Sequence, residues 1–209
     1  HLIEQDCPTT FYALENSDEF TMKNLLCHHL WVNAMPESIK RNNVNFQPAF
    51  DWFLTKHSFR LQSSIRNLHD IFRDAIKSRS KIIFIDYLQI VQFGNERFNN
   101  DIAKWTYYAT KIQAFAKENN ITVIDLSQLS NDVQRAGASG AGSTEFRGGW
   151  ALKDAVDVWL HIFKNEDLPP EPNVSKVTVM LSKNRLWGGV GHKENYSINF
   201  NEGGKYQFI

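Results

Sequence analysis

Short apolar runs alternate along the first two thirds of the chain with longer segments whose apolar residues recur every three or four positions. The short runs, at positions 8–13, 82–86 and 121–126, are rich in β-branched or aromatic residues and predict strands, the last two of them buried. The longer segments predict helices, which are long enough to connect parallel strands. The pattern therefore favours an α/β fold with a mostly parallel sheet flanked by helices.

Three of the expected helices carry a clear apolar face. The first is capped by Asn16 or Ser17, the second by Ser63 or Ser64, and the third ends near Asn119. The expected apolar positions are Phe20, Leu25, Leu26, Leu30 and Met35 in the first helix, Ile65, Leu68, Ile71, Phe72, Ala75 and Ile76 in the second, and Ile102, Trp105, Ala109, Ile112 and Ala116 in the third.

The last third of the chain has a different pattern, with short alternating segments and many turn residues. Strands are expected at 155–163, 177–182, 196–200 and 206–209, and Glu202-Gly203-Gly204 predicts a hairpin. We expect these strands to add in antiparallel fashion to the edge of the sheet. Residues 131–149 are too rich in glycine, serine and alanine to bury a side, and they predict a loop.

Length and charge narrow the class of protein. The chain has 209 residues, enough for one large domain with a core that needs no disulfide. Lysine plus arginine equals aspartate plus glutamate at 23 each, so no overall field indicates nucleic acid or a membrane surface. Basic residues are concentrated between Lys56 and Lys81, which predicts either a polyanion-binding surface or, as we favour, a solvated helix face.

Cysteine content and hydropathy indicate a cytoplasmic protein. Cys7 and Cys27 do not have the spacing of metal ligands, and we expect both to be reduced thiols. No apolar run approaches the ~20 residues that a membrane-spanning helix needs.

One acidic residue, Asp86, directly follows the apolar run 82–85. In open parallel sheets, ligands bind in the crevice at the carboxyl ends of the strands. In nucleotide hydrolases an aspartate at such a strand end helps to hold the Mg²⁺ that bridges the phosphates. The alternative is an aspartate that caps the following turn, so Asp86 alone does not decide the function.

Two further polar residues, Glu15 and Gln128, follow expected strands. If the sheet is parallel, both lie at the same edge as Asp86. A carboxylate that orients water, a carboxylate for a metal and an amide that contacts a terminal phosphate together suit a phosphohydrolase. Taken singly, Glu15 is also typical of a helix start, and Gln128 of a loop.

Two cations, Lys183 and Arg185, lie two positions apart at the end of an expected strand. The period of a strand turns both side chains to the same face, where they repel each other unless an anion such as phosphate lies between them. The alternative is a pair of solvent-exposed charges at a sheet edge.

Five segments of the chain resemble, in order, motifs of the DnaB-family hexameric replicative helicases. Phe-Tyr-Ala-Leu-Glu15-Asn-Ser is similar to the strand-Leu-Glu element, Ile-Ile-Phe-Ile-Asp86-Tyr-Leu-Gln to the Walker B motif, Asp-Leu-Ser-Gln128-Leu-Ser to the sensor strand, Glu145-Phe-Arg147-Gly-Gly-Trp-Ala-Leu-Lys-Asp-Ala-Val-Asp157 to the Asp-Leu-Arg-x-Ser-Gly-Ala element, and Ser-Lys183-Asn-Arg185 to the Lys-x-Arg finger.

The resemblance implies a RecA-like P-loop ATPase core over residues 1–209, with ATP and Mg²⁺ as ligands. Glu15 would be the catalytic base, Asp86 would bind Mg²⁺ through water, and Gln128 would sense the γ-phosphate. Lys183 and Arg185 would reach the nucleotide of the neighbouring subunit in a hexameric ring.

The resemblance also implies a DNA-binding surface. The loops at 92–100 and 135–149 would face the central channel of the ring and single-stranded DNA. Arg135 and Arg147 are the candidates for phosphate contact, although Arg147 also suits a structural role. Trp150 and Gly149 stand where the family usually has glycine and often has serine. The protein would be bacterial or phage-encoded.

The G-x-x-x-x-G-K-[ST] loop, which holds nucleotide phosphates, does not occur in the 209 residues. Family order places it before His1, so we expect this chain alone to hydrolyse ATP poorly or not at all. The alternatives are a non-catalytic RecA-like module that binds DNA or a helicase ring, and a RecA/RadA-type recombinase ATPase. The Asp86-Tyr-Leu-Gln and Lys183-Asn-Arg sequences argue against the recombinase.

Overall fold

The computed structural model describes residues 2–3, 5–128, 149–164, 171–172, 174–199 and 205–208. The chain divides into two compact units, each with its own sheet. The first unit is drawn from the segment up to Leu26, Asn45–Phe98 and Thr110–Gln128, and the second from Cys27–Val44, Asn99–Ala109 and the described residues beyond Gln128.

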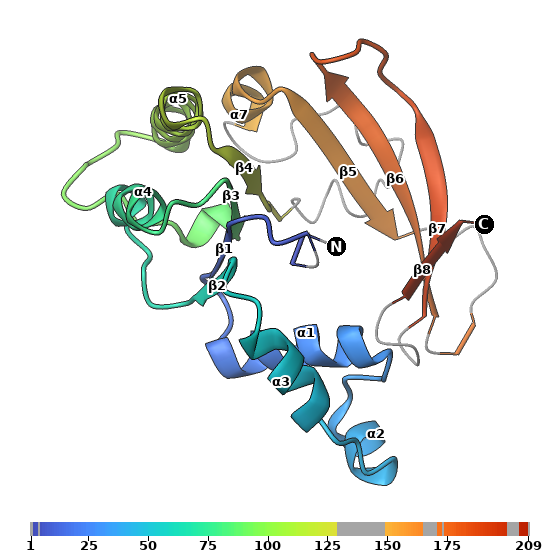
Figure 1. Cartoon of the computed structure of the whole chain (residues 1–209). Coiled ribbons are helices and arrows are strands. Elements are labelled where there is room, and N and C mark those ends of the chain that lie inside the picture. Colours follow the sequence, from blue (N-terminus) through green and yellow to red (C-terminus); the bar gives the residue numbers. More distant parts are fainter. Residues whose placement is uncertain are drawn as a thin grey trace. The chain divides into compact units, whose positions relative to one another are not determined.

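The helices and strands are labelled in Figure 1 in chain order. They are β1 (Thr9–Ala13), α1 (Asp18–Leu30), α2 (Pro36–Arg41), α3 (Gln47–Leu54), β2 (Phe59–Gln62), α4 (Leu68–Lys77), β3 (Ile82–Asp86), the short 3₁₀ helix η1 (Leu88–Ile90), α5 (Asp101–Asn119), β4 (Thr122–Asp125), α7 (Gly149–Ala155), β5 (Val158–Lys164), β6 (Val174–Asn184), β7 (Lys193–Asn199) and β8 (Lys205–Phe208).

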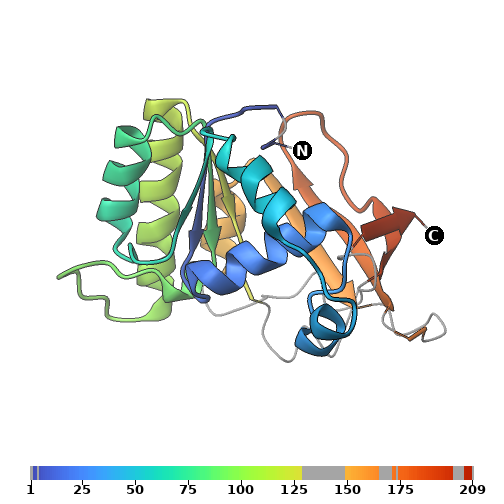
Figure 2. The same cartoon turned by 60° about the horizontal axis from the view of Figure 1, so that its bottom comes forward.

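The sheet of the first unit is parallel throughout, as the alternation of strands and helices predicts. Its strand order is β2-β1-β3-β4, with each pair of neighbours in parallel register. Helix α4 and the C-terminal part of α5 lie side by side against one face of this sheet (Figures 1 and 2). Between these two helices the rings of Phe72 and Phe115 stack with their centroids 4.0 Å apart. The parallel strands therefore end at a common edge, where the candidate site lies.

Two strands of this sheet differ from expectation. β2 was not predicted, because its four residues include the charged Arg60 and lack a clear apolar alternation. β4 was predicted to be buried, but Ile124 and the following Leu126 are exposed. The reason is that β4 is the outermost strand on its side of the described sheet and has one free edge.

The helix caps are partly as predicted. Ser17 caps α1, since its Oγ accepts a hydrogen bond from the backbone amide of Phe20 at 3.2 Å. The prediction of a serine cap for α4 is wrong, because Asn67 occupies that position and accepts from the backbone amides of the first turn. Ser63 and Ser64 instead lie in the connection that follows β2.

The predicted apolar faces include several residues that the structure leaves exposed. Helix α1 ends at Leu30 and Pro36 begins the separate helix α2, so Met35 lies outside the first helix. Ile65 precedes the start of α4 for the same kind of reason. The exposed members of the predicted faces are Phe20, Met35, Ile76 and Ile102.

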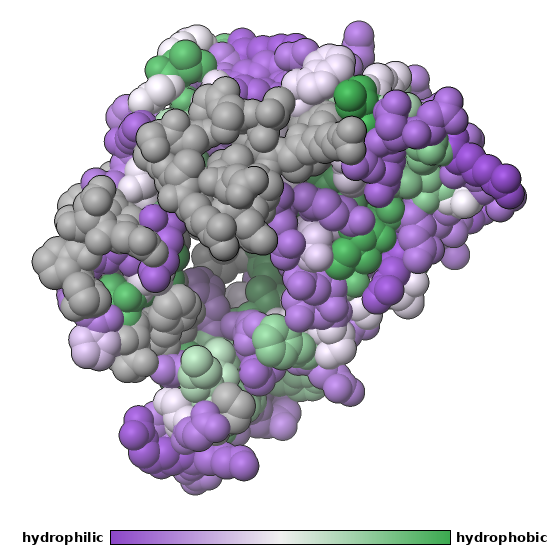
Figure 3. Space-filling view, turned by 180° about the vertical axis from the view of Figure 1, so that it is seen from behind, coloured by the Kyte–Doolittle hydropathy of each residue, from purple (hydrophilic) through white to green (hydrophobic). Residues whose placement is uncertain are grey.

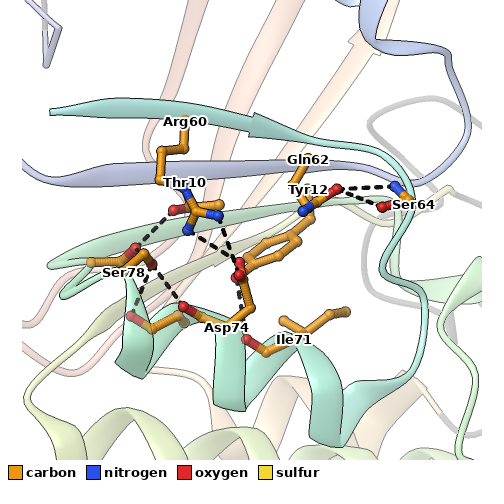
Figure 4. A network of polar contacts seen from close by, with 10 residues as sticks. Thr10, Tyr12, Arg60, Gln62, Ser64, Ile71, Asp74 and Ser78 are labelled. Carbon is orange, nitrogen blue, oxygen red and sulfur yellow. Dashed lines mark hydrogen bonds and ion pairs between the residues drawn. The ribbon is translucent and has the colours of Figure 1, made fainter. Parts of the chain in front are cut away.

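A polar network ties β1 and β2 to α4 (Figure 4). The Asp74 carboxylate accepts both guanidinium nitrogens of Arg60 at 3.2 Å and the Tyr12 hydroxyl at 2.9 Å. Burial raises the pKa of Tyr12 above its ordinary value, and the hydrogen bond to Asp74 raises it further. A charged edge strand is thus held in place by one partly buried carboxylate.

Replacing Asp74 with Asn is expected to lower the free energy of unfolding by about 2 kcal/mol, because the Arg60 pair is lost. Urea denaturation followed by circular dichroism measures this change. The matched control is Asp70→Asn on the same helix. Its partner Arg73 is exposed, so less than about 0.5 kcal/mol should be lost there. Equal effects at the two positions would contradict the role of the network.

The sheet of the second unit is antiparallel, with strand order β5-β6-β7-β8. The predicted antiparallel arrangement is therefore confirmed. The prediction that these strands extend the edge of the parallel sheet is not, since among the described residues they pair only with one another. The predicted hairpin at Glu202-Gly203-Gly204 lies outside the described residues.

The surface is consistent with the balanced composition. Seen from behind, it is mainly hydrophilic, with apolar residues in small groups (Figure 3). Within the described part of the chain, we find no helix with both the length and the apolar character to cross a membrane. Cys7 and Cys27 are both free thiols.

Candidate functional site

Glu15 and Asp86 lie together at the carboxyl edge of the parallel sheet. Ala13, the last residue of β1, is paired with Asp86, the last residue of β3. Beyond this pair, the backbone amides of Leu14 and Glu15 both donate to the Asp86 carbonyl, at 2.7 and 3.3 Å. This turn holds Glu15, whose side chain is exposed, beside the half-buried Asp86. The peptide bond that follows Asp86 is cis.

The two carboxyl groups influence each other electrostatically. Burial raises the pKa of Asp86 above its ordinary value, and the negative charge of Glu15 raises it further. A cation bound at this edge would relieve the repulsion and restore the ionised form of Asp86.

This donor set suits Mg²⁺. In the part of the chain that the structure covers, no three acidic, histidine or cysteine side chains gather as a metal cage. Mg²⁺ does not need such a cage, because it keeps several waters and binds through one or two carboxylates together with substrate phosphates. Asp86, with Glu15 beside it, provides that minimal protein contribution.

Gln128 is positioned by the segment that follows Asp86. The amide of Leu126 donates to the Ile85 carbonyl at 3.0 Å, which keeps the chain beside β3 after β4 has ended. The Gln89 amide nitrogen then donates to Ser127 Oγ and to the Gln128 carbonyl, both at 3.0 Å, and its oxygen accepts the Gln128 backbone amide at 3.4 Å. The Gln128 side chain itself is exposed.

Gln89 is a residue that the sequence did not single out as part of the site. Its only signal was its place in the Asp86-Tyr-Leu-Gln89 sequence. Because it is 39 positions away from Gln128, no local pattern reveals their contact. We assign Gln89 the role of a positioning residue that fixes the backbone on which Gln128 stands.

Lys183 and Arg185 belong to the second unit, and both turn toward the C-terminus of α7. Lys183 Nζ donates to the carbonyls of Lys153 and Asp154, and the Arg185 guanidinium donates to the Asp154 carbonyl. The last carbonyls of a helix lack intrahelical partners and carry partial negative charge, so they favour cations.

The environment of these two cations also includes Asp157. The Arg185 backbone amide donates to the Asp157 carbonyl at 2.8 Å, and its guanidinium lies 3.8 Å from the Asp157 carboxylate. Burial lowers the pKa of Lys183, and the charge of Arg185 lowers it further. The two cations therefore share one face, as their spacing predicts, and helix carbonyls offset their repulsion in this structure.

The predicted DNA contacts are placed only in part. Arg135 and Arg147 lie outside the described residues, so their role stays a prediction. The loop at 92–100 is described, and Gln92 forms an isolated parallel bridge with Asn67. Its proposed contact with DNA also stays a prediction.

The parallel sheet with carboxylates at its strand ends defines a RecA-like core. Three solved structures share the fold: an ATPase domain (TM-score 0.78, 18% identity, 100% of this chain and 76% of that one), a "DnaB-Like Replicative Helicase" described with its primase interactions (0.79, 17%, 99% and 51%), and the RadB recombinase (0.57, 13%, 99% and 81%).

The family model "DnaB-like helicase C terminal domain" matches residues 1–205, and the chain belongs to this family. Among relatives, a "Probable replicative DNA helicase" of Trieres chinensis is 24% identical over 173 residues, which cover 76% of this chain and 37% of the relative. The "Replicative DNA helicase DnaB" of Mycoplasma pneumoniae is 27% identical over 113 residues, 50% of this chain and 24% of the relative. The match thus spans well under half of either relative.

Proposed function

We propose that this chain is the ATPase motor domain of a replicative DNA helicase, which couples ATP hydrolysis to movement along single-stranded DNA. Membership of the DnaB-like C-terminal domain family supports this proposal. The observation that carries it is the pairing of Glu15 with Asp86 at the carboxyl edge of the parallel sheet. Such an edge is where nucleotide ligands bind in sheets of this kind.

In the proposed reaction, Glu15 acts as the general base. Its exposed carboxylate accepts a proton from a water molecule that attacks the γ-phosphate. Asp86 holds Mg²⁺ through water, and the ion when bound neutralises charge on the phosphate oxygens. The Gln128 amide donates a hydrogen bond to a terminal phosphate oxygen. Its position depends on the bonds that Gln89 makes with residues 127 and 128.

The proposed site is completed by a neighbouring copy of the chain in a ring. Lys183 and Arg185 of one copy would neutralise the charge that develops on the nucleotide bound by the next copy. For this, both cations must leave the α7 carbonyls that they contact here. Single-stranded DNA would contact the loops at 92–100 and 135–149, with Arg135 and Arg147 as phosphate contacts.

The proposal is tested by measuring MgATP binding and hydrolysis by the full-length protein, with and without single-stranded DNA. We expect MgATP-dependent hydrolysis that single-stranded DNA stimulates. Binding of DNA without any binding of ATP would contradict the proposal and would instead support a non-catalytic module. Strand exchange between homologous duplexes would support a recombinase.

Replacing Gln89 with Leu is expected to lower kcat by about tenfold to a hundredfold while leaving KM for ATP nearly unchanged, because the Gln128 backbone loses its support. Steady-state ATPase kinetics measure both constants. Gln113→Leu, on the exposed side of α5, is the matched control and should retain wild-type kcat. A Gln89 variant with normal kcat would show that Gln128 needs no such support.

A further inference from the structure

The turn between β6 and β7 presents a group of large apolar side chains to solvent. Trp187 is 85% exposed, Val190 66% and Leu186 58%. An exposed group of this kind is unfavourable in water, and on soluble proteins it marks an interaction site more often than an accident of packing.

The turn that carries these side chains is fixed by its own hydrogen bonds. Asn184 Oδ1 accepts the backbone amides of Leu186 and Trp187 at 3.1 and 3.3 Å, and Asn184 Nδ2 donates to the Gly188 carbonyl at 3.2 Å. Gly188 and Gly189 have φ of +69° and +79°, a conformation that glycine adopts without strain. Because the turn is ordered before any partner binds, little conformational entropy is lost on association.

We propose that this turn is a contact surface for a second copy of the chain and that Trp187 is its anchor. The proposal rests on the function proposed above, because Lys183 and Arg185 stand at the base of the same turn. Tryptophan and arginine at the centre of a contact commonly carry most of its binding energy.

The charges of the chain favour a second copy as the partner. One edge carries the adjacent carboxylates Glu15 and Asp86, and the β6–β7 turn carries the adjacent cations Lys183 and Arg185. A head-to-tail contact would bring the cations of one copy to the carboxylates of the next, and opposite charges would fix its orientation.

The surroundings of Trp187 favour a protein surface over nucleic acid. A platform for single-stranded DNA combines an aromatic ring with cations that face the phosphates. Here both cationic groups are turned to the α7 carbonyls, and the exposed neighbours of Trp187 are Leu186 and Val190. An apolar recess between charged groups is the matching surface on the partner.

The test is the self-association of the full-length protein, measured by sedimentation velocity over a range of concentrations with MgATP. Trp187→Ala is expected to weaken association at least about tenfold, and Trp187→Phe to retain most of it. The exposed Trp31 provides the matched control, since Trp31→Ala removes an equal ring elsewhere and should leave association unchanged. Circular dichroism verifies that each variant is folded.

Three results would overturn the inference. Association of Trp187→Ala at wild-type strength would do so, as would a wild-type protein that stays monomeric throughout. Weaker binding of fluorescein-labelled oligo(dT) by Trp187→Ala with unchanged association would identify a DNA platform instead. Parallel titration of wild type with MgATP separates the two hypotheses: loss of ATP binding contradicts the proposed function, whereas normal ATP binding with normal association of Trp187→Ala contradicts this inference alone.

Discussion

Replacing Glu15 with Gln in the full-length protein is expected to reduce ATP turnover by about 10²–10⁴-fold while MgATP binding is retained. Gln has the size of Glu but cannot accept the proton of the attacking water. The fold should be unaffected, because the contacts that hold this position are made by the backbone amides of Leu14 and Glu15 with the Asp86 carbonyl. Single-turnover hydrolysis and isothermal titration measure the two quantities.

The matched control is Glu19→Gln. Glu19 is exposed in the first turn of α1, four positions beyond Glu15. Its replacement removes the same charge from the same region, and turnover should stay at the wild-type level. Equal losses in the two variants would show that net charge, and not a base at position 15, determines the rate. Full turnover in Glu15→Gln would rule out the assigned role.

Replacing Arg185 with Ala is expected to lower kcat by about 10³-fold, in the range found for arginine fingers that act from a neighbouring subunit. The guanidinium neutralises charge that appears only as the phosphoryl group is transferred, so MgATP binding should change little. Arg185→Lys should recover only part of the rate, because lysine cannot form two parallel hydrogen bonds.

Arg185 also contacts the end of α7, so a structural effect must be separated from a catalytic one. Thermal unfolding followed by circular dichroism detects any loss of stability. Lys193→Ala, at the start of the neighbouring strand β7, removes an exposed cation and serves as the matched control with wild-type kcat. A fully active Arg185→Ala variant would contradict the assignment of Arg185 to the reaction.

The parts of the fold that could be predicted are those with a local signal. β1 and β3 are apolar runs bounded by polar residues, and the helical segments between them require parallel pairing. Parallel pairing in turn brings the ends of these strands to one edge, which is why the proximity of Glu15 to Asp86 followed from their sequence positions. The catalytic roles given to both residues stay predictions.

The parts that could not be predicted depend on contacts between distant positions. β2 is stabilised by the bond of Arg60 to Asp74, 14 positions away, and not by apolar alternation. The support of Gln128 by Gln89 spans 39 positions. The acceptors of Lys183 and Arg185 are backbone carbonyls, which every residue has, so no side-chain pattern could have identified them.

The central claim is that Glu15 of one copy and Arg185 of another form a single catalytic site. Mixing Glu15→Gln and Arg185→Ala subunits, each inactive alone, tests it directly. In an equal mixture about a quarter of the head-to-tail contacts pair an intact Glu15 with an intact Arg185, so single-turnover hydrolysis should return to about a quarter of the wild-type amplitude. If hydrolysis does not recover at any mixing ratio, although mixed assembly is verified by native mass spectrometry, the shared site does not exist.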